Sequence, residues 1–131
     1  MLDPSPSLYD RLGGYDALAA IVDDFLPRLL EDPGLGVYWR GKCKDSLTRD
    51  RQLIVDFLAS AFGGPVMYLG RSMKVSHEGL RITDEEWQRF IGHVTAALRN
   101  LGIPERESAE FLAAAESLKA DVVETAHVAV G

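Results

Sequence analysis

Apolar residues recur at three- and four-residue steps through most of this chain, and no other feature constrains its fold as strongly. In a helix of 3.6 residues per turn, this spacing places the apolar side chains on one face. The apolar runs lie at Leu18–Leu29, Leu53–Ala61, Trp87–Leu101 and Phe111–Val122. No alternating strand pattern, internal repeat or low-complexity tract competes with them. The sequence therefore predicts an all-α fold in which several amphipathic helices surround one core.

Capping residues predict where some of these helices begin. Ser7 is a favoured N-cap for a short helix that ends before the glycine pair at residues 13–14. Thr83 and Glu86 have the spacing of a capping box, which predicts the start of the third long helix. Pro104 suits the first position of the last helix. Another short helix is expected at about residues 73–79, after an extended loop over residues 66–72.

The chain has 131 residues, a length that suits one domain. We expect a disordered lead-in at residues 1–6, one folded domain at residues 7–125 and a frayed tail at residues 126–131. The net charge of −6, with no basic stripe, argues against binding to nucleic acid.

The expected location is the cytoplasm. No apolar run approaches the roughly 18 residues of a membrane-spanning helix. The first ten residues lack the basic and apolar regions of a signal peptide. The single cysteine, Cys43, cannot form an internal disulfide bond, which fits a reducing compartment.

Few residues match a known chemical motif, and His77 is the main candidate for a functional side chain. Three scattered histidines and one cysteine do not have the spacing of a zinc site, and no phosphate-binding or hydrolase motif occurs. Met73 precedes His77 by four residues and Leu80 follows it by three, which favours an imidazole that projects into an apolar space. Taken alone, a histidine in such a setting is more often a structural residue than a ligand.

Four segments together resemble the truncated globins of group I. They are SLYDRLGG at residues 7–14, DDFLPRLLED at 23–32, AFGGPVMYLGR at 61–71 and MKVSHEGLRIT at 73–83. The resemblance extends over about residues 7–125. It implies a two-over-two helical sandwich that holds haem b without a covalent bond, with His77 as the protein ligand to the iron.

The resemblance also implies which residues surround the haem. A bound His77 would donate its other ring N–H to an acceptor, and the carbonyl of Met73 lies one helical turn before it. Arg71 and Lys74 are the expected partners of the propionates. The residues that match the apolar haem wall are Phe57, Met73, Trp87, Phe90 and Ile91. Ordinary core packing predicts the same burial for these side chains.

On the distal side the chain departs from the family pattern. Leu26 stands where the family usually has a tyrosine, so the usual hydroxyl donor to bound oxygen is missing. Asp50, Leu53 and Ile54 take the positions of the distal glutamine and histidine, and two of these three side chains cannot donate a hydrogen bond. We therefore expect oxygen to be released faster, because a lost donor in a dry pocket costs about 1–2 kcal/mol.

Other aromatic and polar residues are candidates for the missing donor. Tyr38 is interpreted either as a donor or as part of the aromatic wall, Trp39 preferably as wall, and Gln52 as a further candidate donor. No histidine or lysine falls at the distal positions, so the iron is expected to keep an open site. His93 and His127 are expected to face solvent.

The haem is expected to be held without a covalent bond. Some relatives attach it through a histidine three residues before an aspartate in the last helix. In this chain the residue three positions before Asp121 is Leu118, which cannot form that bond.

These expectations leave three functional hypotheses. The first is a binder of oxygen, nitric oxide and carbon monoxide, a monomer or weak homodimer served by an unidentified reductase. The second is a haem enzyme with nitric oxide dioxygenase, nitrite reductase or peroxidase activity. The third is a helical interaction module without haem.

Overall fold

The computed structural model describes residues 6–70 and 72–123. The lead-in and tail expected at residues 1–6 and 126–131 fall wholly or mostly outside this part, so the domain boundaries stay predictions. The described helices are α1 (Leu8–Leu12), α2 (Tyr15–Glu31), η1 (a 3₁₀ helix, Gly36–Trp39), α3 (Lys44–Ala61), α4 (Met73–His77), α5 (Asp84–Asn100), α6 (Glu105–Glu116) and α7 (Lys119–Val122). No strand occurs among the described residues.

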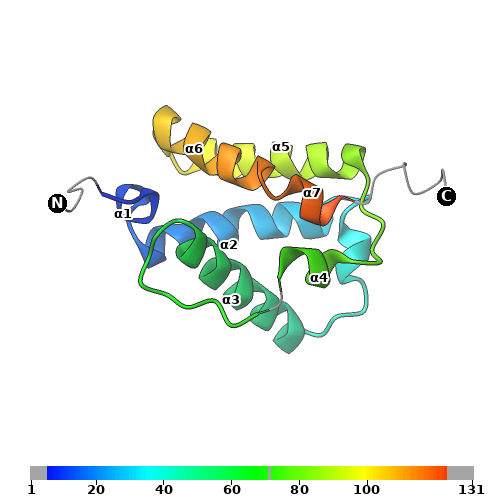
Figure 1. Cartoon of the computed structure of the whole chain (residues 1–131). Helices are drawn as coiled ribbons and strands as arrows, with labels where there is room; N and C mark the ends of the chain where they lie inside the picture. Colours follow the sequence, from blue (N-terminus) through cyan, green and yellow to red (C-terminus); the bar gives the residue numbers. More distant parts are fainter. Residues whose placement is uncertain (1–5, 71, 124–131) are drawn as a thin grey trace.

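Two pairs of helices form the body of the molecule. Figure 1 shows α2 and α3 running in opposite directions, and α5 and α6 doing the same. The helix α2 packs against both α3 and α5 and so joins the two pairs. The short helices α4 and α7 pack against each other. The long helices therefore form the body of the fold, and the short helix α4 is positioned by its contact with α7.

The cap residues confirm two of the predicted helix starts. The Oγ atom of Ser7 accepts a hydrogen bond from the amide of Asp10 at 3.1 Å, and α1 ends at Gly13, whose φ of 118° is left-handed. At α5 the capping box is complete, because Thr83 and Glu86 each accept from the other's backbone amide.

Two details of the last helix were predicted wrongly. Pro104 is the N-cap residue of α6 and not its first helical residue. The expected single helix also divides at residues 117–118 into α6 and α7. The Oγ atom of Ser117 donates to the carbonyl of Ala114 at 2.6 Å, a local bond of the kind that competes with helix continuation.

The core lies mainly where α2 meets α3 and α5. Leu18, Ile21 and Val22 of α2 are fully buried there, together with Val55 of α3 and Ala97 of α5. A smaller apolar cluster forms beside α4 and contains Trp87, Val122 and Val123. Within the part of the chain that the structure describes, no helix is long and apolar enough to cross a lipid bilayer.

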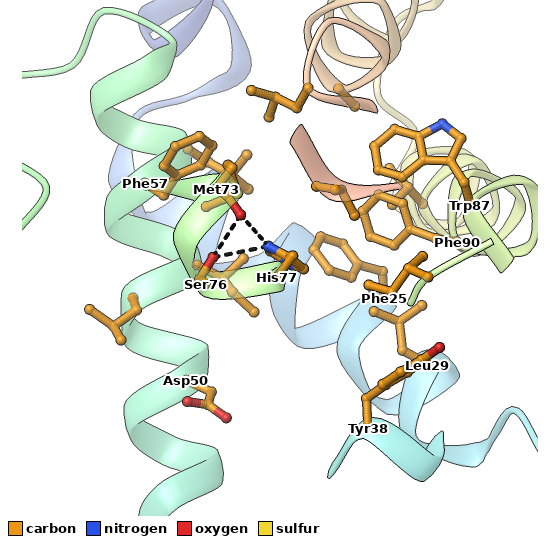
Figure 2. A pocket seen from close by; sticks show the side chains of 18 of the residues that line it. Phe25, Leu29, Tyr38, Asp50, Phe57, Met73, Ser76, His77, Trp87 and Phe90 are labelled. Carbon is orange, nitrogen blue, oxygen red and sulfur yellow. Dashed lines mark hydrogen bonds between the residues drawn. The ribbon is translucent and has the colours of Figure 1, made fainter. Parts of the chain in front are cut away.

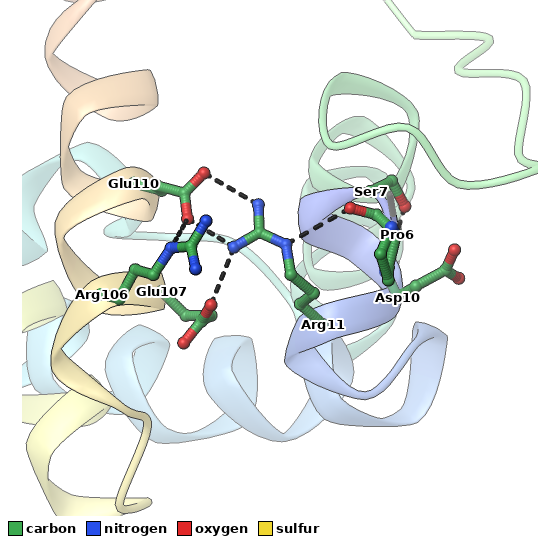
Figure 3. A network of polar contacts seen from close by, with 7 residues as sticks. All are labelled: Pro6, Ser7, Asp10, Arg11, Arg106, Glu107 and Glu110. Carbon is green, nitrogen blue, oxygen red and sulfur yellow. Dashed lines mark hydrogen bonds and ion pairs between the residues drawn. The ribbon is translucent and has the colours of Figure 1, made fainter. Parts of the chain in front are cut away.

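An ion-pair network joins the first helix to α6. Figure 3 shows the guanidinium of Arg11 between Glu107 and Glu110, at distances of 2.7 and 2.5 Å from their Oε2 atoms. The second guanidinium nitrogen binds Oε1 of Glu110 at 2.8 Å. This hydrogen bonding lowers the pKa of Glu110 and raises that of Arg11. The network connects α1 to the last long helix.

A second network is centred on Asp32, directly after α2. Its Oδ1 atom accepts from the amides of Gly34 and Leu35, and its Oδ2 atom accepts from His93 Nε2 at 2.8 Å. Arg89 binds the same carboxylate. The Asp32 side chain is only 7% exposed, and its pKa lies well below the ordinary range because of His93 first and then the Gly34 amide. Asp32 therefore connects the end of α2 to the α5 side chains.

Replacing Thr83 by alanine should lower the free energy of unfolding by about 1 kcal/mol, because one cap bond at the start of α5 is lost. Urea titration followed by circular dichroism measures this change. The Thr83→Ser variant keeps the hydroxyl and serves as control. Equal stability of the alanine variant and the wild type would contradict a role for the capping box.

The Asp32 network should make stability depend on pH. The pKa of Asp32 is lower in the folded state, so its contribution is complete above about pH 4, the ordinary pKa of an aspartate. The contribution is lost as the pH falls towards the folded pKa. The Asp32→Asn variant should therefore lose less stability between neutral and acidic pH than the wild type, as measured by urea midpoints across pH. If the stability of the variant and of the wild type fell equally with pH, the role given to Asp32 would be contradicted.

Candidate functional site

The space between α3, α4 and α5 holds a cavity of about 500 Å³. This volume lies within the roughly 300–1,000 Å³ of small-molecule and cofactor sites. Side chains from α2, η1, α6 and α7 complete its walls, and most of them are apolar. The cavity thus has the size and apolar character of a cofactor pocket.

The short helix α4 carries His77 at its last position. The amide of Ser76 bonds the carbonyl of Ser72 at 2.9 Å, which forms the helical turn before His77. The chain then leaves the helix at Gly79, which has a left-handed φ of 86° that glycine adopts without strain. Met73 packs against the cluster formed by Trp87 and Val122, so the start of α4 is fixed by apolar contacts.

Two oxygen atoms bind one nitrogen of the His77 ring. Nδ1 lies 2.8 Å from the carbonyl oxygen of Met73 and 2.9 Å from Oγ of Ser76, which itself donates to the Met73 carbonyl. Figure 2 shows these three contacts as a triangle. A carbonyl oxygen only accepts, so Nδ1 carries the proton. In the neutral ring, Nε2 then keeps a free lone pair, the form that binds a metal.

The apolar walls contain most of the side chains predicted for a haem wall. Phe57 of α3, Met73 of α4, and Trp87 and Phe90 of α5 all line the cavity. In Figure 2 the His77 ring reaches from α4 towards Phe25 and Phe90, with Phe57 on the other side. Trp87 is 3% exposed, and its indole nitrogen donates to Glu116 at 2.7 Å. The predicted wall is therefore assembled around the candidate ligand.

Tyr38 lines the cavity from η1, but its hydroxyl proton already has an acceptor. The hydroxyl donates to Oε1 of Glu86 at 2.8 Å, and the same carboxylate accepts from the Thr83 amide. Burial, and then the neighbouring Glu86, raises the pKa of Tyr38 to about 12. In this arrangement the Tyr38 side chain is part of the cavity wall, and its hydroxyl proton is bonded to Glu86. Trp39 also lines the cavity and is partly buried.

The predicted distal residues of α3 lie on the cavity wall as well. Leu53 and Ile54 line it and are half-buried. Asp50 lies one turn earlier on the same wall, and its Oδ2 atom accepts from Lys42 Nζ at 2.5 Å. This part of the pocket therefore combines two aliphatic side chains with one ion pair.

Four predicted site residues do not lie on the described wall. Leu26 is buried in the main core, because successive residues of a helix differ by about 100° and the preceding Phe25 takes the cavity side. Ile91 packs against the cluster that contains Trp87. Lys74 is exposed and does not line the cavity. Arg71 lies outside the described residues.

The remaining candidates also lie away from the site. Gln52 is exposed, bonds Tyr15 and Asp56, and does not line the cavity. His93 does not face solvent freely, because it is half-buried and paired with Asp32. His127 lies outside the described residues.

Several lining residues were missed by the sequence analysis of the site. Phe25 and Leu29 belong to the apolar face of α2, and their four-residue spacing was visible, but core packing explained it equally well. Glu86 was interpreted only as a capping residue. Leu118 and Val122 line the cavity at and after the division between α6 and α7, and no sequence signal predicted that division.

The residues present fit the haem that the sequence resemblance implies. Haem needs apolar walls for its porphyrin faces and a neutral imidazole for its iron. The cavity provides both, with the Nε2 lone pair of His77 free of protein partners among the described residues.

Comparisons with known proteins agree with this fit. The family model described as bacterial-like globin matches residues 7–124. Group 1 truncated hemoglobin GlbN of Mycolicibacterium paratuberculosis is 35% identical over 116 residues, which cover 88% of this chain and 83% of that protein. Group 1 truncated hemoglobin LI410 of Chlamydomonas moewusii is 32% identical over 119 residues, which cover 89% of this chain and 68% of that protein.

Solved structures show the same fold. Truncated hemoglobin of Tetrahymena pyriformis in its Fe(III) form superposes with a TM-score of 0.83 at 24% identity, covering 90% of this chain and 98% of the other. The 2/2 hemoglobin of Synechococcus sp. PCC 7002, with covalently attached heme, gives a TM-score of 0.80 at 26% identity, with coverage of 90% and 98%. The predicted two-over-two helical sandwich is thereby confirmed, and the chain belongs to the bacterial-like globin family, among its group 1 truncated hemoglobins.

Proposed function

We propose that this chain binds haem b through His77 without a covalent bond and takes up diatomic gases, oxygen among them, on the opposite side of the haem. Membership of the globin family already implies haem and haem-based gas binding. The observation that carries the finer proposal is the single free imidazole nitrogen on the wall of an apolar cavity. Haem supplies an iron that binds oxygen, nitric oxide and carbon monoxide.

Non-covalent binding is supported by the histidines of the described chain. His93 is paired with Asp32 and does not line the cavity. Leu118 lines the cavity at the position where some relatives have the histidine that bonds haem. Affinity would then come from the His77 bond and from buried apolar wall residues, each contributing about 1.5–3 kcal/mol when fully buried.

An open gas-binding position is supported by the side chains opposite. Leu53 and Ile54 have no atom that binds iron, and Lys42 is bound to Asp50. We further propose that the protein works in the cytoplasm as a monomer or weak homodimer, and that a reductase returns its haem to the ferrous state.

The His77→Ala variant should lose most of its haem, because the cavity then offers no imidazole to the iron. The measurement is the haem-to-protein ratio after purification, together with the ferrous absorption spectrum with and without carbon monoxide. His93→Ala is the matched control and should keep its haem. Normal haem content in His77→Ala, or a wild-type protein that takes up neither haem nor carbon monoxide, would contradict the proposal.

Tyr38→Phe should leave the rate of oxygen dissociation almost unchanged, because the Tyr38 hydroxyl donates to Glu86. A hydrogen bond from Tyr38 to oxygen would instead be worth about 1.4 kcal/mol, or about a tenfold faster release on its removal. Stopped-flow mixing of the oxygenated protein with carbon monoxide measures this rate. A tenfold acceleration would show that Tyr38 turns from Glu86 to the ligand.

A further inference from the structure

Asp50 is a carboxylate on the wall of a mainly apolar cavity. Its Oδ2 atom is bound to Lys42, but Oδ1 has no hydrogen-bond partner among the described residues. The side chain is 25% exposed and lines the cavity, so it is not sealed in the protein interior. Figure 2 shows Asp50 on α3, on the opposite side of the view from Tyr38. The cavity therefore presents a free acceptor oxygen.

The neighbouring polar groups, Tyr38 and Lys42, do not add a free hydrogen-bond donor beside this acceptor oxygen. The hydroxyl proton of Tyr38 is directed to Glu86, which leaves lone pairs on its oxygen. Lys42 is a donor, but its ammonium group is paired with Asp50 and is 40% exposed. An ionised carboxylate can only accept. Asp50 is therefore unfavourable for oxygen, whose bound form carries partial negative charge, and favourable for a molecule that brings its own proton.

We propose that Asp50 is a general base for hydroperoxides in this cavity, with hydrogen peroxide as the simplest member of the substrate class. The inference rests on the proposed function, because the peroxide reacts only when haem is present. Hydrogen peroxide suits the site because each of its two oxygens carries a proton, and an organic hydroperoxide still carries one. With haem bound, Oδ1 of Asp50 would accept a proton from the peroxide.

The proposed step is a proton transfer. An O–H bond of hydrogen peroxide breaks, the proton moves to Oδ1 of Asp50, and the bonding electron pair stays on the oxygen. The products are a hydroperoxide anion and the carboxylic acid of Asp50. No electron is transferred, so the step needs no reductant. A positioned general base typically accelerates such reactions by about 10²–10⁴-fold.

The test mixes ferric, haem-loaded protein with hydrogen peroxide in a stopped-flow instrument and follows the Soret band. Asp50→Asn and Asp50→Leu should both react about 100-fold more slowly than the wild type. Asp50→Glu keeps a carboxylate and should retain most of the rate. Asp45→Asn is the matched control, since it removes the same charge from an exposed position of α3 that does not line the cavity.

A second measurement does not depend on peroxide. Asp50→Asn places an amide donor at the same position, so oxygen dissociation from the ferrous protein should become about tenfold slower. Asp50→Leu provides no donor and should not slow it. Wild-type peroxide rates in Asp50→Asn, or unchanged oxygen release in that variant, would overturn the role of Asp50. Failure to bind haem or carbon monoxide would instead overturn the proposed function itself.

Discussion

The hydrogen bond between Nδ1 of His77 and the carbonyl of Met73 is the interaction on which the site depends. Both atoms belong to the same short helix, and the α4 backbone brings these two residues one turn apart. It fixes the protonated nitrogen on the helix side and leaves the other nitrogen to the cavity. The additional contact with Ser76 at 2.9 Å holds the ring in the same orientation. The chemistry of the pocket is thus set by local backbone geometry.

The rest of the fold keeps α4 in place and shapes the opposite wall. Met73 packs against the cluster of Trp87, Val122 and Val123. Val122 belongs to α7, the short helix that follows the division after α6. Glu86 has two roles at once, since it caps α5 and also accepts the Tyr38 hydroxyl. A residue of the α5 capping box therefore also determines which polar atoms the cavity presents. A change at Glu86 would alter stability and ligand environment together.

Sequence patterns predicted the features that depend on local physics. Helical periodicity and the caps at Ser7 and Thr83 predicted most of the long helices, because each depends on neighbours within one or two turns. The hydrogen bond from His77 to Met73 was predicted for the same reason. The misses depend on contacts far apart in sequence: Phe25 takes the cavity side in place of Leu26, and His93 pairs with Asp32. Periodicity places Phe25 on an apolar face but does not distinguish a cavity side from a core side, and it carries no information on the pairing of His93 with Asp32.

The central claim is that the free nitrogen of His77 binds the haem iron. Resonance Raman spectroscopy of the ferrous, ligand-free protein tests it most directly, because a low-frequency band reports the bond between iron and imidazole. We expect this band to be present and to shift when the histidines carry ¹⁵N. The His93→Ala protein should show the same band and shift. A haem-loaded protein without a ¹⁵N-sensitive band, or one whose band survives removal of the His77 imidazole, would contradict the account.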